Sequence, residues 1–155
     1  MLKKNNIMLL VVACLSLFSL SYFRESYFLT LNSVVQGQLK SNSHIDFLYS
    51  FFKTIDINKL YIHKWTSTVF FSLIFIGFTL YFLYKYFLNI HYVKIVGYLY
   101  LVVILVVSIV GLISYWLGLF NQWYFILRFI AGIVQSPLVF FFFIPLFSFV
   151  NMIKE

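Results

Sequence analysis

Four long apolar runs, separated by shorter polar stretches, dominate the chain. A helix needs roughly 20 apolar residues to cross a bilayer core about 30 Å thick. None of the runs shows the alternation typical of a transmembrane β-strand, so each predicts a membrane-spanning helix whose backbone groups pair internally. We expect an all-α fold, an integral membrane bundle of four transmembrane helices in one membrane domain. The predicted helices cover residues 7–23, 65–87, 95–120 and 124–150, and the domain covers residues 1–155.

Residues 24–64 form the one sizeable segment that we expect outside the membrane core, as an extramembrane or interfacial loop. The segment is too short and too apolar for an independent globular domain. Apolar and aromatic side chains recur within it at helical spacing, which predicts a short helix lying in the membrane interface. These side chains are Ile45, Leu48, Tyr49 and Phe52. Residues 36–43 (QGQLKSNS) predict a flexible connection.

The first apolar run has the basic start and apolar middle of a secretory signal peptide. A small-residue cleavage site is missing, since Ser21–Arg24 is a poor one. Val11–Cys14 is similar to a bacterial lipobox, but only Ile7–Val12 precedes the cysteine within the run. We therefore expect an uncleaved helix with a small buried Cys14, and lipidation of that cysteine is the alternative.

Composition agrees with a membrane protein, because 63% of the residues are hydrophobic and only 10% are charged. Average soluble domains are about half apolar and a quarter charged, so that class is excluded. The single cysteine cannot form an internal disulfide. The formal net charge is +7, yet the basic residues are spread singly. Without a basic cluster to follow a phosphate backbone, nucleic acid is not an expected partner.

The same basic residues are expected to hold helix ends at the lipid headgroups. Four crossings would place both termini on one side of the membrane. Lys3 and Lys4 at the start, and Lys85 and Lys94 around a short turn, favour the cytoplasm for that side.

Few residues indicate chemistry. His44, His63 and His91 lack the spacing of metal ligands, and no glycine-rich phosphate loop is present. Cys14 lies inside the first predicted helix, away from groups that could activate its thiolate. The expectation is a protein that is not an enzyme and has no cofactor and no metal.

Polar residues at membrane depth are the more informative ones, because burying them in lipid costs free energy. Arg128 lies near the start of the last predicted helix. It could reach the headgroups, pair with Glu25 or contact a partner. Gln135 lies on roughly the same face and is expected to bond a neighbouring helix. Pro137 and Pro145 predict that the last helix is either kinked or packed against neighbours that satisfy the freed carbonyl groups.

The third predicted helix carries Gly111, Ser114 and Gly118. Small residues at this spacing allow two helices in a membrane to approach closely. The three residues therefore predict a seam against a neighbouring helix.

The first predicted helix is followed by an arginine and aromatic residues, Arg24, Tyr27 and Phe28, and the last predicted helix contains an arginine, a glutamine and two prolines. Together these short patterns resemble a family of small bacterial membrane proteins, the exosortase F- or X-system-associated proteins. The family pattern has an arginine pair where this chain has Leu127-Arg128, and no residue where this chain has Ser136. The matching residues are Arg24, Glu25, Tyr27, Phe28, Phe51, Phe52, Lys53, Leu127, Arg128, Phe129, Gln135, Pro137, Ile144 and Pro145.

The resemblance implies an accessory of a membrane protein-sorting system in the bacterial inner (cytoplasmic) membrane. This chain would be the companion of the exosortase and not the enzyme, with the lipid bilayer and an exosortase-like protein as its partners. A homo-oligomer is the other assembly considered. The candidate partner-contact or structural residues are Arg24, Glu25, Arg128, Gln135, Pro137 and Pro145.

Two other classes of function, transport and catalysis in the membrane, remain open. The alternative is a subunit of a small oligomeric transporter or channel, although Arg128 and Gln135 alone would line a poor pathway. A membrane enzyme acting on lipid or peptide is the third class, and nothing in the sequence orders its candidate acidic residues. Those residues are Glu25, Asp46 and Asp56.

Overall fold

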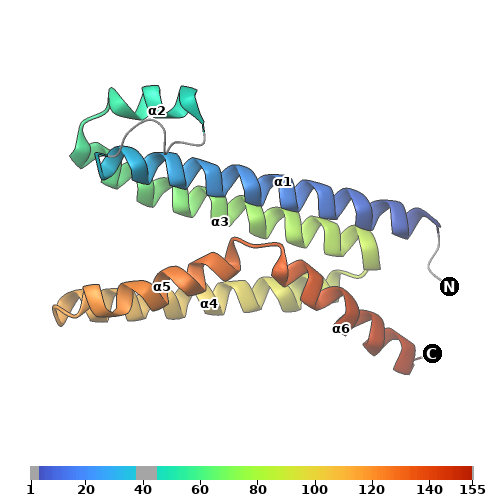
Figure 1. The fold of residues 1–155 in the computed structure, drawn as a ribbon. Helices are drawn as coiled ribbons and strands as arrows, with labels where there is room; N and C mark the ends of the chain where they lie inside the picture. Colours follow the sequence, from blue (N-terminus) through green and yellow to red (C-terminus); the bar gives the residue numbers. More distant parts are fainter. Residues whose placement is uncertain (1–3, 38–44, 155) are drawn as a thin grey trace.

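The computed structural model describes residues 4–37 and 45–154, and every element in this part of the chain is an α-helix (Figure 1). Within these residues three helices are long and apolar enough to cross a membrane, and a bent pair adds a fourth crossing if it counts as one span. The expected all-α membrane bundle is confirmed, and the chain is a multi-pass membrane protein. In chain order the helices are α1 (Lys4–Val35), α2 (Asp46–Lys53), α3 (Ile57–Phe87), α4 (Ile90–Trp116), α5 (Phe120–Val134) and α6 (Leu138–Lys154).

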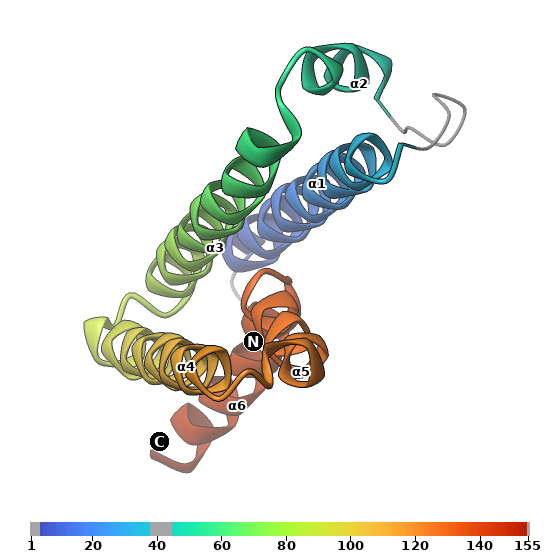
Figure 2. The same cartoon turned by 90° about the vertical axis from the view of Figure 1, so that its left-hand side faces the viewer.

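The long helices form two antiparallel pairs, α1 with α3 and α4 with α5 (Figures 1 and 2). α3 also packs against α4, which joins the two pairs, and α6 continues beyond α5 and packs against α3. α1 begins and α6 ends at the same end of the bundle (Figure 1). The fully buried apolar side chains of the core between these helices include Leu17, Phe75, Leu83, Val96 and Phe140.

The first helix is much longer than residues 7–23, because α1 continues to Val35. Arg24 and Glu25 were expected to end it, but a charge ends an apolar run without ending a helix. Beyond them, the hydroxyl of Thr30 donates to the carbonyl of Ser26 at 2.8 Å, so a buried polar side chain is satisfied inside the helix. Cys14 is half-buried in α1.

The predicted loop over residues 24–64 is correspondingly wrong, since α3 begins at Ile57 and not at residue 65. The short helix predicted inside the loop is confirmed as α2, which lies alongside the end of α1 (Figure 1). Its Phe52 is buried in a small second core with Leu31 and Leu60. The predicted flexible stretch 36–43 lies largely outside the described residues.

α4 covers Ile90–Trp116, shifted toward the N-terminus from the predicted 95–120. Its start is set by Asn89, whose side chain accepts a hydrogen bond from the backbone N–H of His91 at 2.9 Å. Its end is set by Gly118, which has a φ of +69°. The backbone N–H of Leu119 donates to the carbonyl of Ser114 at 2.9 Å, which completes a Schellman turn.

This turn corrects part of the small-residue seam predicted on the third helix. Gly118 ends the helix and does not pack within it. Ser114 is buried, and a Cβ placed on Gly111 would lie 3.8 Å from Leu127 on α5. Gly111 and Ser114 therefore form the close contact between α4 and α5.

The turn between α3 and α4 offers a first prediction. Leu88 has a φ of 51°, a left-handed conformation that is unfavourable for a residue with a Cβ, and its side chain is 76% exposed. Leu88→Gly is expected to raise the free energy of unfolding by about 0.5–1 kcal/mol, and Gly118→Ala to lower it by a similar amount. Chemical unfolding in detergent measures both. A loss of stability in Leu88→Gly would contradict this account of the turn.

The last predicted span, residues 124–150, is two helices, α5 and α6, bent by 55° relative to each other. The break falls at residues 135–137, where Pro137 cannot donate a backbone hydrogen bond. At the start of α6 that missing donor costs little. Pro145 lies inside α6, which continues through it. Of the two predicted alternatives, a kink is therefore found at the Pro137 break.

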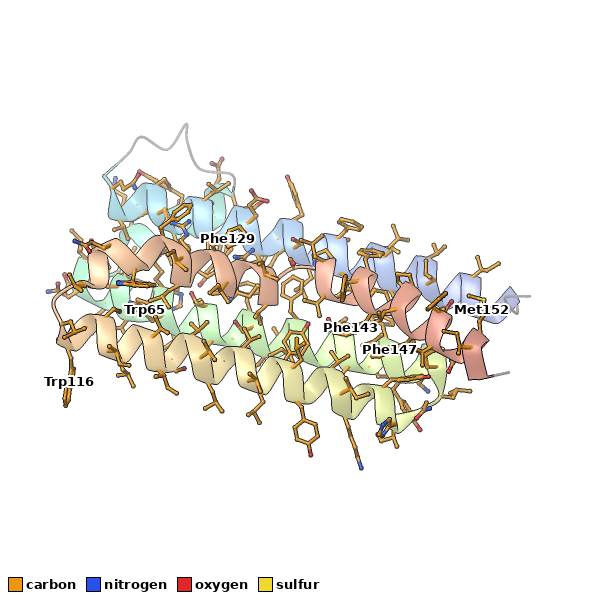
Figure 3. All side chains as sticks on the ribbon, turned by 90° about the horizontal axis from the view of Figure 1, so that it is seen from below. Trp65, Trp116, Phe129, Phe143, Phe147 and Met152 are labelled. Atoms are coloured by element: carbon orange, nitrogen blue, oxygen red, sulfur yellow. The ribbon has the colours of Figure 1, made fainter. Side chains whose placement is uncertain are left out.

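An aromatic cluster fixes α6 against the N-terminal end of α4. The ring of Tyr92 stacks on Phe147 with 4.3 Å between centroids, and its hydroxyl donates to the side chain of Asn151. Phe143, one turn earlier on α6, stacks on Phe147 with 5.2 Å between the ring centroids, and Figure 3 labels both residues. Aromatic stacking and the hydrogen bond between Tyr92 and Asn151 therefore stabilise this end of the bundle.

Candidate functional site

Aromatic and basic side chains mark two levels along the bundle that match the boundaries of a bilayer core. Trp65 and Lys85 on α3 are about 20 residues apart, or about 30 Å along a helix, which is the thickness of the hydrocarbon core. Trp65 and Trp116 are exposed toward the same end of the bundle (Figure 3). Tryptophan favours the interface between lipid and water, so we place one boundary at the level of Trp65.

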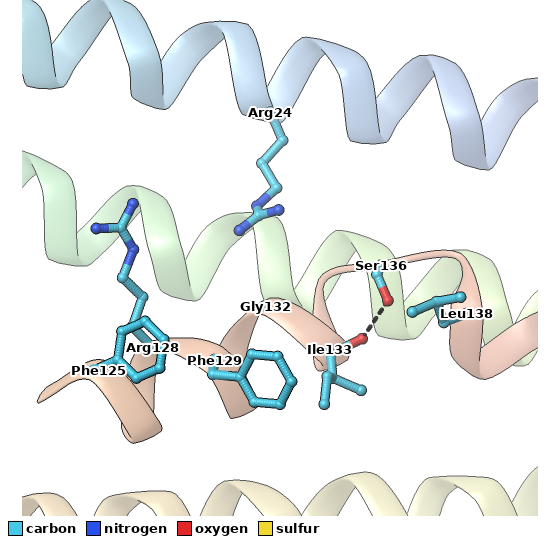
Figure 4. Close-up of a pocket in the computed structure, with 8 residues that line it drawn as sticks. All are labelled: Arg24, Phe125, Arg128, Phe129, Gly132, Ile133, Ser136 and Leu138. Carbon is cyan, nitrogen blue, oxygen red and sulfur yellow. Dashed lines mark hydrogen bonds between the residues drawn. The ribbon is translucent and has the colours of Figure 1, made fainter. Parts of the chain in front are cut away.

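Two arginines from different helices face each other close to this boundary. Arg24 of α1 and Arg128 of α5 line one pocket of about 400 Å³, and Figure 4 shows both guanidinium groups in the space between the two helices. α1 packs on α3 and α5 packs on α4, which leaves α1 and α5 apart at this level. The other lining residues are Phe125, Phe129, Gly132, Ile133, Ser136 and Leu138.

Arg24 is the more enclosed of the two arginines. Its guanidinium carbon lies 5.8 Å from the centroid of the Phe28 ring, and its buried Nε has no hydrogen-bond partner among the described residues. Arg128 is exposed and lies close enough to Arg24 and Lys64 for their charges to repel. Three cations thus gather at one end of the span, and none of the residues lining the pocket is a carboxylate.

Glu25, which was considered as a partner for Arg128, does not line this pocket. Successive residues of an α-helix point about 100° apart, so Arg24 and Glu25 face different directions. Arg24 faces Arg128, and Glu25 lies on the exposed side of α1. Within the described part of the chain Glu25 forms no ion pair with Arg128.

Gln135 sits at the break between α5 and α6 and is 1% exposed. Its Nε2 donates to the backbone carbonyl of Thr68 at 2.8 Å and to the hydroxyl of Ser72 at 2.6 Å, both on α3. The prediction that Gln135 bonds a neighbouring helix is therefore confirmed. These bonds hold the break against the middle of α3, and Pro137 is buried beside it.

A second polar cluster lies between α1 and α3, and it was not predicted from the sequence. The hydroxyl of Tyr27 lies 2.6 Å from Nε2 of His63 and 3.0 Å from the hydroxyl of Ser67. Rings of Phe52 and Phe71 pack edge-on against Tyr27. His63 and Ser67 share one helix face at i and i+4, but that signal is visible only once the helix is extended back to residue 57.

A neighbouring pair extends this polar interface toward the end of the bundle. The ammonium group of Lys64 donates to Oδ1 of Asn32 at 2.8 Å. Among the described residues no group of three or more histidine, cysteine, aspartate or glutamate side chains could hold a metal ion. The described residues place two guanidinium groups beside one pocket, and on another side of α1 they expose the carboxylate of Glu25, whose charge acts on the neighbouring Arg24.

Comparisons with protein-family models, with curated proteins and with solved structures find no match to this chain. Function is therefore inferred from the described residues and from their positions relative to the membrane.

Proposed function

We propose that this protein is a non-catalytic integral membrane protein that binds a second membrane protein through the outer face of α1 around Glu25. An exosortase-type sorting enzyme of the bacterial inner membrane is the candidate partner that the resemblance suggests. The observation that supports the proposal is a carboxylate exposed on the outside of a membrane-spanning helix.

Glu25 belongs to an exposed stripe that runs along α1 at helical spacing. Phe18 is 57% exposed and Tyr22 is 73% exposed, and Leu29 continues the stripe one turn beyond Glu25. Residues at i, i+4, i+7 and i+11 lie on one side of a helix. At one end of the stripe the ring of Phe18 lies 5.7 Å from that of Phe141 on α6, so a helix of another protein could pack along the part from Tyr22 to Leu29.

The depth of Glu25 follows from its neighbours. Tyr27 is level with Ser67, to which it is bonded, and the ring of Phe23 lies 6.2 Å from Phe71. Glu25 therefore lies just inside the boundary marked by Trp65. A carboxylate facing lipid is costly, and its short side chain reaches the headgroups less easily than arginine or lysine does. A basic or hydroxyl side chain on a partner helix would remove this cost.

The alternative, a subunit of an oligomeric transporter or channel, is favoured by one observation, the broken last span. Broken helices form the substrate sites of many transporters. In this chain, however, the amide of Gln135 at the break is bonded to α3. A polar path would therefore have to be completed by a second copy of the chain.

The proposed orientation places both termini in the cytoplasm. Lys85 and Lys94 are exposed at the end of the bundle where α1 begins and α6 ends, in the positions that the positive-inside rule weights. A thiol reagent that does not cross membranes should label Lys94→Cys only in inverted vesicles. Labelling in intact cells or right-side-out vesicles would contradict this orientation.

The decisive experiment is a mild-detergent pull-down of tagged protein from its native membrane, followed by mass spectrometry. The wild-type protein should carry a stoichiometric membrane protein. Glu25→Gln should lower its recovery about tenfold or more, because a charged hydrogen bond contributes about 1.5–3 kcal/mol. Asp56→Asn removes the same charge from an exposed position at the start of α3 and is the matched control.

Equal recovery of the partner with Glu25→Gln, at normal protein abundance, would reject Glu25 as the contact. A homo-oligomer that carries no other protein would favour the transporter or channel alternative.

A further inference from the structure

We infer that the pocket between Arg24 and Arg128 binds the phosphate of an anionic phospholipid headgroup. The first support is the facing of two guanidinium groups across a space of about 400 Å³ (Figure 4). Arg128 repels both Arg24 and Lys64, and the neighbouring Glu25 offsets this repulsion at Arg24 only. An anion placed between the two arginines turns this repulsion into attraction, and the buried Nε of Arg24 is a free donor for it.

The outer end of the pocket, at Arg128, matches the phosphate level of a bilayer. Gln135 is bonded to Thr68 and Ser72, which fixes the level of α5 relative to α3. Arg128 lies two helical turns from Gln135 toward the end of the bundle, which brings it level with Lys64 and Trp65. That level is the boundary between hydrocarbon and headgroups. A ligand at this position therefore has its charge where lipid phosphates lie.

The walls of the pocket suit a lipid better than a free anion. Phe125, Phe129, Ile133 and Leu138 supply apolar lining below and beside the arginines. α1 packs chiefly on α3 and α5 chiefly on α4, so the pocket between α1 and α5 is not enclosed, and its residues Phe129 and Leu138 are exposed on the surface that would meet lipid. A headgroup can enter from the membrane while its acyl chains stay in lipid against these side chains. Inorganic phosphate has no apolar part that could contact these walls.

The chemistry also separates classes of lipid. Phosphate oxygens can accept from two guanidinium groups at once, and each planar fork can donate two parallel hydrogen bonds. A headgroup that ends in a quaternary ammonium would bring its cation close to Lys64 and the arginines. Anionic headgroups such as phosphatidylglycerol should therefore bind more tightly than phosphatidylcholine. The contact proposed at Glu25 lies on another side of α1, although the charge of Glu25 also acts on Arg24, so each site is tested with its own variants.

Native mass spectrometry of the full chain in detergent tests the inference. The protein is titrated with phosphatidylglycerol and with phosphatidylcholine of the same acyl chains. We expect wild-type protein to bind phosphatidylglycerol at least tenfold more tightly, since each basic residue near an anionic lipid contributes appreciably. The double variant Arg24→Gln/Arg128→Gln should lose this preference. Lys85→Gln/Lys94→Gln removes the same charge at the other end of the bundle and should keep it.

The conservative variant Arg24→Lys/Arg128→Lys keeps the charge but not the planar forks, and should retain part of the preference. If the glutamine variant fails to fold, the lipid preference of the lysine variant tests the inference in its place. Added inorganic phosphate at equal concentration should not displace the lipid. Displacement would identify a free anion as the ligand and overturn the inference. So would equal binding of the two lipids, an equal loss in both double variants, or a co-purified protein that occupies the pocket in place of lipid.

Discussion

Replacing Phe140 by alanine is expected to lower the free energy of unfolding by about 3 kcal/mol, the usual cost of a cavity of this size. The residue is 0% exposed, and it lies in the first turn of α6 directly after the break. Its ring lies 6.1 Å from the ring of Phe82 on α3. In lipid the surrounding solvent is itself apolar, so the loss is chiefly one of dispersion contacts.

Phe142 provides a matched control for this prediction, since it lies on the same helix and is 64% exposed. Phe142→Ala should change the free energy of unfolding by about 0.5 kcal/mol or less. Reversible unfolding in mixed detergent micelles would measure the change in the free energy of unfolding for both variants. Equal losses in the two variants would mean that α6 does not pack against α3 as described.

The second large effect is expected at Gln135. Gln135→Leu keeps the volume of the side chain but removes two hydrogen bonds to α3, at a cost of about 1–2 kcal/mol. Thr68 and Ser72 remain paired with each other, since the hydroxyl of Ser72 also donates to the carbonyl of Thr68 at 2.9 Å. The lower free energy of unfolding therefore measures the loss of the hydrogen bonds between Gln135 and α3. It does not include the cost of an unsatisfied polar group on α3.

A structural measurement distinguishes this role from a general loss of stability. Spin labels on the exposed faces of α3 and α6 should show a narrow distance distribution in the wild-type protein and a broad one in Gln135→Leu. Gln122→Leu is the control, because Gln122 is an exposed amide near the start of α5. An unchanged distribution in Gln135→Leu would show that Pro137 and packing alone hold the bend.

The apolar runs were sufficient to predict the fold class and the positions of the spans. They were insufficient for the ends of the helices, because hydropathy reports where lipid ends and not where a helix ends. α1 passes through Arg24 and Glu25 since both are good helix formers. α3 begins earlier than its apolar run because Leu60 is buried in the second core, and because the polar side chains of His63 and Lys64 are hydrogen-bonded to α1.

The candidate site was predictable in part. Gln135 could be predicted to bond a neighbour, because a buried amide in lipid is costly without a partner. The facing of Arg24 and Arg128 could not be predicted. It depends on the rotation of α1 and α5 about their axes, and that rotation is set by contacts between residues far apart in sequence. The same contacts turn Glu25 outward, away from Arg128, for which it was considered as a partner.

The break between α5 and α6 also constrains how the protein is made. α5 has 15 residues and α6 has 17, so neither half alone reaches across a bilayer core, which needs about 20. Between them, Pro137 has no backbone N–H, and the side-chain amide of Gln135 would meet lipid without its partners on α3 if the last span entered the membrane alone. The last span should therefore leave the translocation machinery only after α3 is in place to receive Gln135. Insertion of this segment becomes a step that follows earlier helices in an obligatory order, and a truncated chain lacking α3 should fail to retain it in the bilayer.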